Sequence, residues 1–138
     1  MGFFPLLLSK LYIMKDFLIG IDHPAIAADD VEALTKWYCD ALGYKVFFRT
    51  PKPVYIIEAP DGTYIEILPK NDTPRPERTN ATPGLSHLAI RVNDMDVAME
   101  ALDTFNVVWG GPEFVPAGGG RIRNFTDPEG NALQLIQR

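Results

Sequence analysis

The two histidines of this chain, His23 and His87, are 64 positions apart in two similar stretches, "GIDHPAIA" and "GLSHLAIR". Further along each copy, the runs "APDGTYIEIL" and "DPEGNALQLI" carry Glu66 and Gln134 at corresponding places, with an offset of 68. Two imidazoles, one carboxylate and one amide oxygen can bind a divalent ion such as Zn, Ni, Co, Mn or Fe, and the set does not discriminate among these metals. Either histidine alone is better interpreted as a hydrogen-bonded core residue. The repeat predicts a metal site of all four residues, provided that a pseudo-two-fold axis brings them together.

Other residues that could do chemistry have weaker patterns. No serine lies in the strand-turn-helix setting of a hydrolase nucleophile. Asp127 and Glu129 are paired carboxylates, but they lie in a turn, where shaping the chain is the commoner role. Arg121 and Arg123 can bind an anionic substrate or line a solvated strand edge. Cys39 lies in a helical pattern that favours core packing over nucleophilic chemistry.

Periodicity predicts that each copy contains one strand, one helix and three further strands. The first strands are expected at "IGIDHPAIA" and "LSHLAIRV". The helices are expected to follow N-caps at Asp29 or Asp30 and at Asn93 or Asp94, and to end at about Leu42, before Gly43, and at about Phe105. The later strands are expected at "YKVFFRT", "PVYIIEA" and "TYIEILP" and, less clearly, at "VVWG", "PEFVPA", "RIRNFT" and "NALQLIQ".

Length and composition indicate one compact domain. The 138 residues are 46% hydrophobic and 22% charged, which is typical of a globular protein. A net charge of −5 argues against nucleic acid and anionic membranes as partners, because both bind through clustered Lys and Arg. A small-molecule substrate is therefore expected. The single cysteine excludes an internal disulfide and a thiolate cluster, which fits a cytoplasmic setting.

Two segments lie outside the repeat. Residues 1–16 contain an apolar run interrupted by proline, serine and lysine. We interpret this run as an arm that packs on a partner subunit or as a start assigned too early, and not as a membrane span or signal peptide. Residues 69–83 are expected to be an extended, proline-containing linker. The linker would join module one (17–68) to module two (84–138) within a single domain of residues 17–138.

The repeated modules resemble the vicinal-oxygen-chelate superfamily, which contains the glyoxalase, bleomycin-resistance and extradiol-dioxygenase proteins. The stretches that carry the resemblance are "IDHPAIAADDVEALTKWYCDALGYKV", "LSHLAIRVNDMDVAMEAL" and "FTDPEGNALQLIQ". The resemblance implies an α+β fold in which two βαβββ modules form a U-shaped mixed sheet around a central cleft, usually in a homodimer. The family's metal ligands come from the first and last strands of each module. These positions are His23, Glu66, His87 and Gln134 in this chain.

The resemblance leaves the reaction open. Glyoxalase I enzymes commonly have carboxylates at both last-strand positions, so Gln134 departs from their pattern. Methylmalonyl-CoA epimerase has two His, one Gln and one Glu, with the amide and the carboxylate in the opposite modules. Bleomycin-resistance proteins keep the fold without a metal. Three functions follow: a metal-dependent lyase or isomerase of glyoxalase type acting on a small vicinally oxygenated substrate, a metal-free binding protein, or an extradiol-type dioxygenase using His23, His87 and Glu66.

In the lyase or isomerase, the metal would act as a Lewis acid at the developing negative oxygen. Glu66 would be both a ligand and a proton carrier, because the Gln134 amide cannot be a general base at neutral pH. The sequence identifies no second base. An apolar pocket or the core would contain the aromatic residues Tyr55, Tyr64, Trp109, Phe114 and Phe125.

Overall fold

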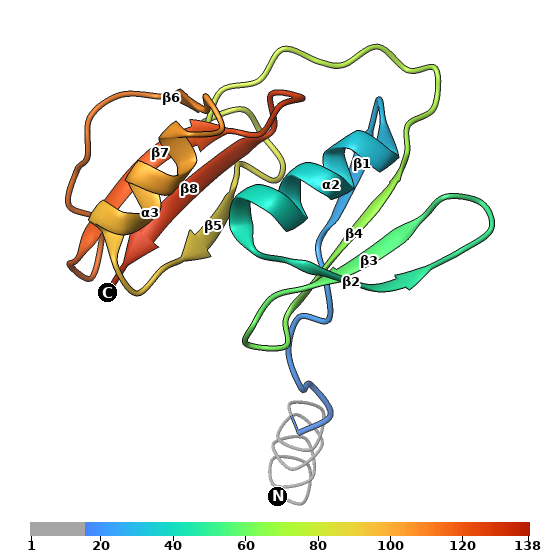
Figure 1. The fold of residues 1–138 in the computed structure, drawn as a ribbon, viewed down its shortest axis with the longest axis horizontal. Helices are drawn as coiled ribbons and strands as arrows, with labels where there is room; N and C mark the ends of the chain where they lie inside the picture. The colour runs from blue at the N-terminus through green and yellow to red at the C-terminus, as the bar shows by residue number, and fades with distance from the viewer. Residues whose placement is uncertain (1–15) are drawn as a thin grey trace, which may run out of the picture.

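Two modules of the same architecture make up the computed structural model, which describes residues 16–138. Module one contains β1 (Ala25–Ala28), α2 (Val31–Leu42), β2 (Lys45–Arg49), β3 (Tyr55–Glu58) and β4 (Tyr64–Pro69). Module two contains β5 (Leu88–Arg91), α3 (Met95–Asp103), β6 (Val108–Trp109), β7 (Arg121–Thr126) and β8 (Ala132–Gln137). The α+β class and the two βαβββ modules are therefore confirmed (Figure 1). The arm or early start predicted for residues 1–16 lies, apart from Asp16, outside the described residues.

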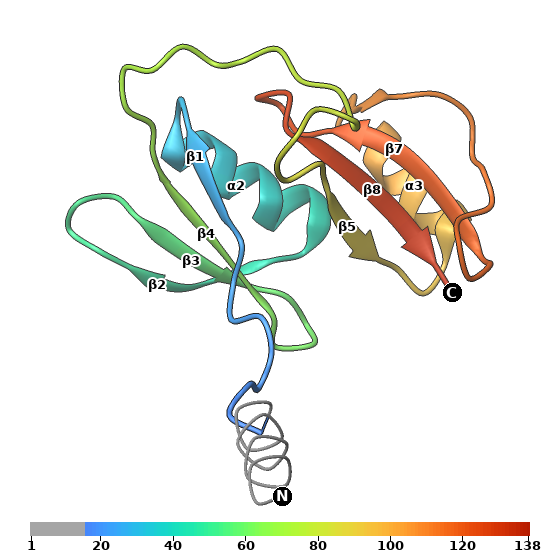
Figure 2. The ribbon, with the colours of Figure 1, turned by 180° about the vertical axis from the view of Figure 1, so that it is seen from behind.

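Each module forms its own four-stranded sheet, and the two sheets have the same strand order. The strand order is β1-β4-β3-β2 in module one and β5-β8-β7-β6 in module two, and β1 with β4 and β5 with β8 are the parallel pairs. The register is also repeated, because Ala25 lies opposite Glu66 and Ala89 lies opposite Gln134. Each helix packs against its own sheet. The face of each sheet that its helix does not cover is called the open face below, and Figure 2 shows the strands in front of the helices.

Local signals in the sequence set the bounds of the helices. The Asp30 side chain accepts a hydrogen bond from the backbone N–H of Ala33, and α2 ends at Leu42, before the C-cap residue Gly43, which has a φ of 77°. The Asp94 side chain caps α3 in the same way through the N–H of Val97. This helix ends at Asp103, slightly before the predicted end, because a turn follows it.

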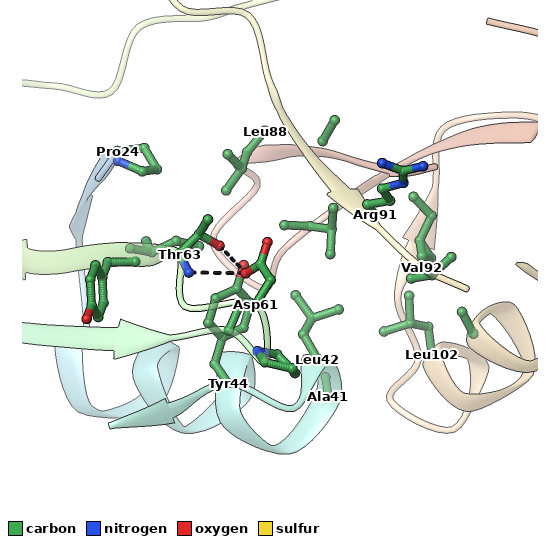
Figure 3. A pocket seen from close by; sticks show the side chains of 18 of the residues that line it. Pro24, Ala41, Leu42, Tyr44, Asp61, Thr63, Leu88, Arg91, Val92 and Leu102 are labelled. Atoms are coloured by element: carbon green, nitrogen blue, oxygen red, sulfur yellow. Dashed lines mark hydrogen bonds between the residues drawn. The ribbon is translucent and has the colours of Figure 1, made fainter. Parts of the chain in front are cut away.

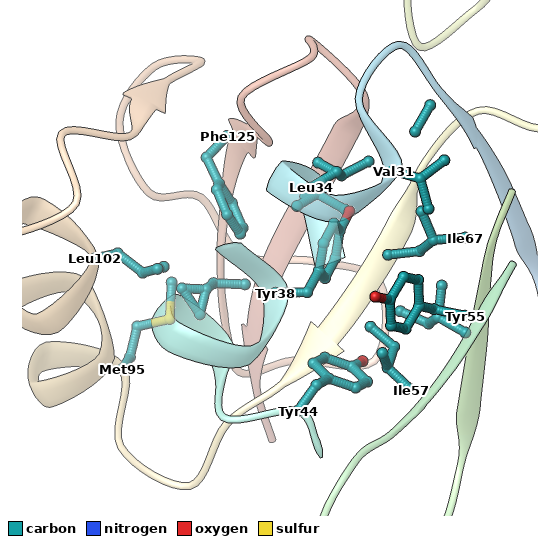
Figure 4. Packing of buried hydrophobic residues seen from close by; sticks show 14 residues of the cluster. Val31, Leu34, Tyr38, Tyr44, Tyr55, Ile57, Ile67, Met95, Leu102 and Phe125 are labelled. Carbon is teal, nitrogen blue, oxygen red and sulfur yellow. The ribbon is translucent and has the colours of Figure 1, made fainter. Parts of the chain in front are cut away.

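One hydrophobic core joins the two modules. Tyr38 in α2 is fully buried and lies between side chains of both modules, including Met95 of α3 and Phe125 of β7 (Figure 4). The Tyr38 hydroxyl donates a hydrogen bond of 2.9 Å to the buried carboxylate of Asp127, in the turn between β7 and β8. Burial and the charge of Asp127 raise the pKa of Tyr38, so the phenol stays protonated and remains a donor.

The first strand of each module is shorter than the sequence predicted. Both candidate histidines, His23 and His87, precede the strands β1 and β5 and do not lie within them. Pro24 has no N–H for a ladder, and β1 and β5 are edge strands of their sheets. The strand predicted at "PEFVPA" is also absent as a regular strand, and Phe114 forms only an isolated bridge with Ile122.

The predicted linker crosses from one module to the other without a helix or strand after Pro69 (Figure 1). Arg75 lies 3.5 Å from Glu129 of module two and 3.6 Å from Asp29 of module one, so its guanidinium bridges the modules. The Arg78 guanidinium donates hydrogen bonds to backbone carbonyl oxygens at residues 82, 83 and 85. Within residues 16–138, no helix is long and apolar enough to cross a membrane.

The loop predicted at "AGGGR" contains a glycine at a close backbone approach. Gly120 has a φ of 95°, and a Cβ atom placed there would lie 2.2 Å from the carbonyl oxygen of Gln137. Gly119 has a φ of 84°, but a Cβ atom there would meet nothing within 4 Å. We expect Gly120→Ala to lower the free energy of unfolding by about 2–3 kcal/mol and Gly119→Ala by about 1 kcal/mol. Urea unfolding measures both, and equal losses would contradict the steric explanation.

Candidate metal centre

The half-site of module one consists of His23 and Glu66. The Nε2 atom of His23 lies 2.9 Å from Oε2 of Glu66, and Nδ1 lies 2.6 Å from Oδ2 of Asp22. Since an ionised carboxylate only accepts hydrogen bonds, the Nδ1–H group donates to Asp22. By the same rule, an Nε2–H group donates to Glu66. A metal ion bound beside Glu66 would replace this proton, and Asp22 holds the ring in the orientation that such binding would need.

The charges around His23 favour a cation at this place. The hydrogen bond to Asp22 raises the pKa of His23 above its ordinary value, desolvation opposes the rise, and Glu66 adds to it. A divalent ion would be stabilised by the same two carboxylates. Two ligand atoms that bind one ion at about 2.1 Å and at the right angle of an octahedral site lie about 3 Å apart. The distance of 2.9 Å from His23 Nε2 to Glu66 Oε2 fits neighbouring positions around such an ion.

Glu66 lies on the open face of the module-one sheet, because side chains alternate between the two faces along β4. Ile65 and Ile67 are buried in the core, and Glu66 is on the other side of the strand with a partly exposed side chain. Ile56 of β3 is directly opposite Glu66, and the Phe47 ring packs against Tyr64 at 5.1 Å. Two strand neighbours of Glu66 on this face, Ile56 and Tyr64, are therefore apolar or aromatic, and the face is open to solvent.

The half-site of module two repeats this plan with neutral partners. The Ser86 hydroxyl donates to the backbone oxygen of Asn80 at 2.8 Å and lies 2.8 Å from His87 Nδ1. Because a hydroxyl has one proton, Ser86 accepts from His87 Nδ1–H, and His87 Nε2 keeps its lone pair. Gln134 is 8% exposed, and its Nε2 donates to Asn124 Oδ1 at 2.9 Å. Both candidate ligands of module two are thus held through the atom that would not bind the metal.

A single chain does not assemble the four candidate ligands. Among the described residues, no group of three or more His, Cys, Asp or Glu side chains could hold a metal ion, so His87 does not join His23 and Glu66 in such a group. The hydrogen bonds of His87 and Gln134 stay within module two. The convergence of all four at a pseudo-two-fold axis therefore stays a prediction.

Two cavities adjoin these half-sites. One, of about 1300 Å³, is lined by His87, Asn124, the linker and the start of β1. The other, of about 670 Å³, separates the end of α2 from β5, with Tyr44 and Leu42 on one side and Leu88 on the other (Figure 3). The first cavity brings solvent-accessible space to His87, whereas the second contains none of the four candidate ligands.

The paired carboxylates of the second turn shape the chain, as predicted. Asp127 is buried and accepts hydrogen bonds from Tyr38 and from its own turn. The Glu129 carboxylate accepts from the backbone N–H groups of Asp29 at 2.6 Å and Asp30 at 3.0 Å. These contacts fix the start of α2 to module two and leave neither carboxylate directed at the half-sites.

Both candidate arginines have partners within the chain. Arg121 donates to Glu113 and Asp96, each at 2.7 Å, and these hydrogen bonds lower the pKa of both carboxyl groups. Arg123 lies over the Trp109 ring at 4.3 Å. Ion pairs and stacking therefore account for both side chains, and an anionic substrate is not needed to explain them.

The remaining sequence candidates have mainly packing roles. Cys39 is partly buried against the core, and burial raises the pKa of its thiol, as a packing role predicts. Tyr55 and Phe125 are buried in the core. Tyr64 lies on the open face of the module-one sheet, together with Glu66.

Sequence reasoning did not identify the residues that orient the candidate ligands. Asp22 and Ser86 immediately precede the two histidines, and their offset of 64 was a usable signal. Asn124 had no local signal, because only the β7–β8 register places it opposite Gln134.

Comparison with known proteins gives one matching family model and two similar bacterial proteins. A family model described as "Glyoxalase/Bleomycin resistance protein/Dioxygenase superfamily" matches residues 20–135. The uncharacterized protein YaeR of Escherichia coli (strain K12) is 32% identical over 124 residues, which cover 86% of this chain and 95% of YaeR. The uncharacterized protein YwkD of Bacillus subtilis (strain 168) is 29% identical over 126 residues, 88% of this chain and 98% of YwkD.

Solved structures share the fold at lower identity. A superfamily member from Sphaerobacter thermophilus has a TM-score of 0.72 at 21% identity, covering 88% of this chain and 99% of that one. Lactoylglutathione lyase from Agrobacterium tumefaciens has a TM-score of 0.66 at 17% identity, with coverages of 87% and 94%. A point mutant of the fosfomycin resistance protein FosX from Listeria monocytogenes, complexed with Mn(II) and dihydroxypropylphosphonic acid, has a TM-score of 0.67 at 16% identity, with coverages of 86% and 90%.

Proposed function

Since the chain belongs to the glyoxalase/bleomycin resistance protein/dioxygenase superfamily, we propose that it is a metal-dependent lyase or isomerase of the glyoxalase type. Its substrate would be a small molecule with oxygens on adjacent atoms. The observation that carries this proposal is the His23–Glu66 contact of 2.9 Å, with the far side of the ring held by Asp22. The same plan recurs in module two at His87.

A second copy of the chain would complete the site. Ile21 and Leu85 lie two residues before the two histidines, and they are 90% and 89% exposed. Both precede edge strands, β1 and β5, whose outer sides have no strand partner among the described residues. Exposed apolar side chains beside free strand edges favour burial against another chain. We propose a homodimer in which module one of one chain meets module two of its partner, so that each centre contains His23, Glu66, His87 and Gln134.

The bound ion would supply Lewis-acid stabilisation of negative charge that develops on a substrate oxygen. Two neutral histidines, one amide and one carboxylate leave the centre with one net positive charge, which makes it more electrophilic than a centre with two carboxylates. Asp22 and Ser86 orient the rings of His23 and His87.

Glu66 is the proposed proton carrier. Only Oε2 of its carboxylate contacts His23, and no hydrogen bond or ion pair to Oε1 is present among residues 16–138. That oxygen can take a proton from a substrate on the open face, beside Ile56 and Tyr64. A Gln134 amide cannot replace Glu66 in this role.

Metal content tests the proposal. Mn²⁺, the ion in the FosX complex, is a suitable probe. We expect protein purified without chelator to carry about one divalent ion per chain, and His87→Ala to carry none, because a neutral imidazole ligand is lost. Elemental analysis after gel filtration gives the ratio. The metal-free binding protein would instead be favoured by two results together: the wild-type protein carries no stoichiometric metal, and His87→Ala does not change the binding of a small-molecule ligand.

A further inference from the structure

Asn124 is the only polar side chain that a candidate ligand of module two contacts across the sheet within the described residues. It lies in β7, directly opposite Gln134 of β8, and its Oδ1 accepts the hydrogen bond of 2.9 Å from Gln134 Nε2. The corresponding pair in module one is Ile56 opposite Glu66. The carboxylate therefore has an apolar neighbour across the strands, whereas the amide has a hydrogen-bond acceptor.

This difference follows from the chemistry of the two groups. A carboxylate has two equivalent oxygens, and either can bind a metal. A carboxamide binds through its oxygen only, so its NH₂ group points away from the ion and needs an acceptor when it is buried. Gln134 is 8% exposed, and solvent cannot readily supply that acceptor.

The surroundings of Asn124 hold it in place. The backbone N–H of Gly110 donates to the backbone carbonyl oxygen of Asn124 at 2.8 Å, and a Cβ atom at Gly110 would lie 3.1 Å from Asn124 Cβ. A glycine at this position thus leaves room for the Asn124 side chain. Asn124 also lines the cavity that contains His87.

We propose that Asn124 is a positioning residue that directs the Gln134 carboxamide oxygen toward the metal. The inference rests on the proposed function, because it requires Gln134 to be a ligand. It explains how module two can use an amide where module one uses a carboxylate: the amide is effective only with an acceptor opposite it. Asn124 itself does not touch the ion.

Four variants separate positioning from simple packing. Asn124→Leu removes the acceptor and keeps the branched shape of the side chain, and Asn124→Asp keeps the acceptor. Each substitution is made in two backgrounds, the protein with Gln134 and the Gln134→Glu variant. We expect Asn124→Leu to weaken Mn²⁺ binding about 10- to 100-fold when residue 134 is Gln. With Gln134→Glu the loss should nearly vanish, because the pair then matches Ile56 and Glu66. Asn124→Asp should weaken Mn²⁺ binding little when residue 134 is Gln. It should weaken binding more in the Gln134→Glu protein, because two carboxylates would then lie opposite each other.

Calorimetric titration of the metal-free protein with Mn²⁺ measures the affinities, and the absorption spectrum of the Co²⁺-loaded protein reports the ligand set. Thermal unfolding without metal controls for stability. An equal Asn124→Leu loss in both backgrounds, or no loss in either, would overturn the inference while wild-type metal binding upholds the proposed function. Absence of metal binding in the wild type would overturn both. If Asn124→Leu does not fold, the contrast between the two Asn124→Asp proteins decides the matter.

Discussion

Asp127→Ala is expected to lower the free energy of unfolding by about 3–5 kcal/mol, the largest loss of stability that we predict for a single substitution. The Asp127 carboxylate is 3% exposed and accepts hydrogen bonds from the Tyr38 hydroxyl and from Asn131 and Glu129 in its own turn. Alanine would leave the buried Tyr38 hydroxyl without an acceptor and release the turn that faces α2. Urea unfolding followed by fluorescence measures the loss.

Two further variants show whether the contact between modules is responsible. Tyr38→Phe removes one donor and is expected to cost about 1–2 kcal/mol. Asp61→Ala, in the corresponding turn of module one, removes an exposed carboxylate whose side-chain hydrogen bonds among residues 16–138 are to Thr63 alone, and it is expected to cost less than about 1 kcal/mol. Similar losses for Asp61→Ala and Asp127→Ala would show that turn formation, and not the link to α2, accounts for the effect.

Glu66→Ala is expected to weaken Mn²⁺ binding by at least about 100-fold, because it removes the only carboxylate of the proposed centre. Glu66→Gln should recover little of this affinity, because Ile56 lies opposite residue 66 and provides no acceptor for the amide NH₂ group. Glu58 provides a matched control. It lies opposite Tyr64, which places it on the same open face as Glu66, but it has no histidine partner among the described residues. Equal affinities for Glu66→Ala and Glu58→Ala would exclude Glu66 as a ligand.

Local signals predicted the elements that they control directly. The N-caps at Asp30 and Asp94 and the C-terminal Gly43 act within one helical turn, and the structure confirms all three. The strand expected at "TYIEILP" is also present as β4, and its alternation places Glu66 on the face opposite to the buried Ile65 and Ile67.

Features that depend on distant partners were not predictable. The strands expected to include His23 and His87 begin after them, since edge strands have a ladder partner on only one side. The pairing of Tyr38 with Asp127 spans 89 residues and exists only after the modules pack. Asn124 acquires its relation to Gln134 from the sheet register. Repetition indicated which residues correspond, but a single chain does not show whether the two half-sites meet.

Complementation between chains tests the proposed shared centre most directly. One variant would carry His23→Ala with Glu66→Ala, and the other His87→Ala with Gln134→Ala, so neither homodimer would contain an intact centre. A heterodimer would join the intact module two of the first to the intact module one of the second. Elemental analysis of differently tagged, co-expressed and doubly purified chains is expected to give one divalent ion per heterodimer and none per homodimer. A metal-free heterodimer, alongside a wild-type protein that binds metal, would contradict a centre shared between two chains.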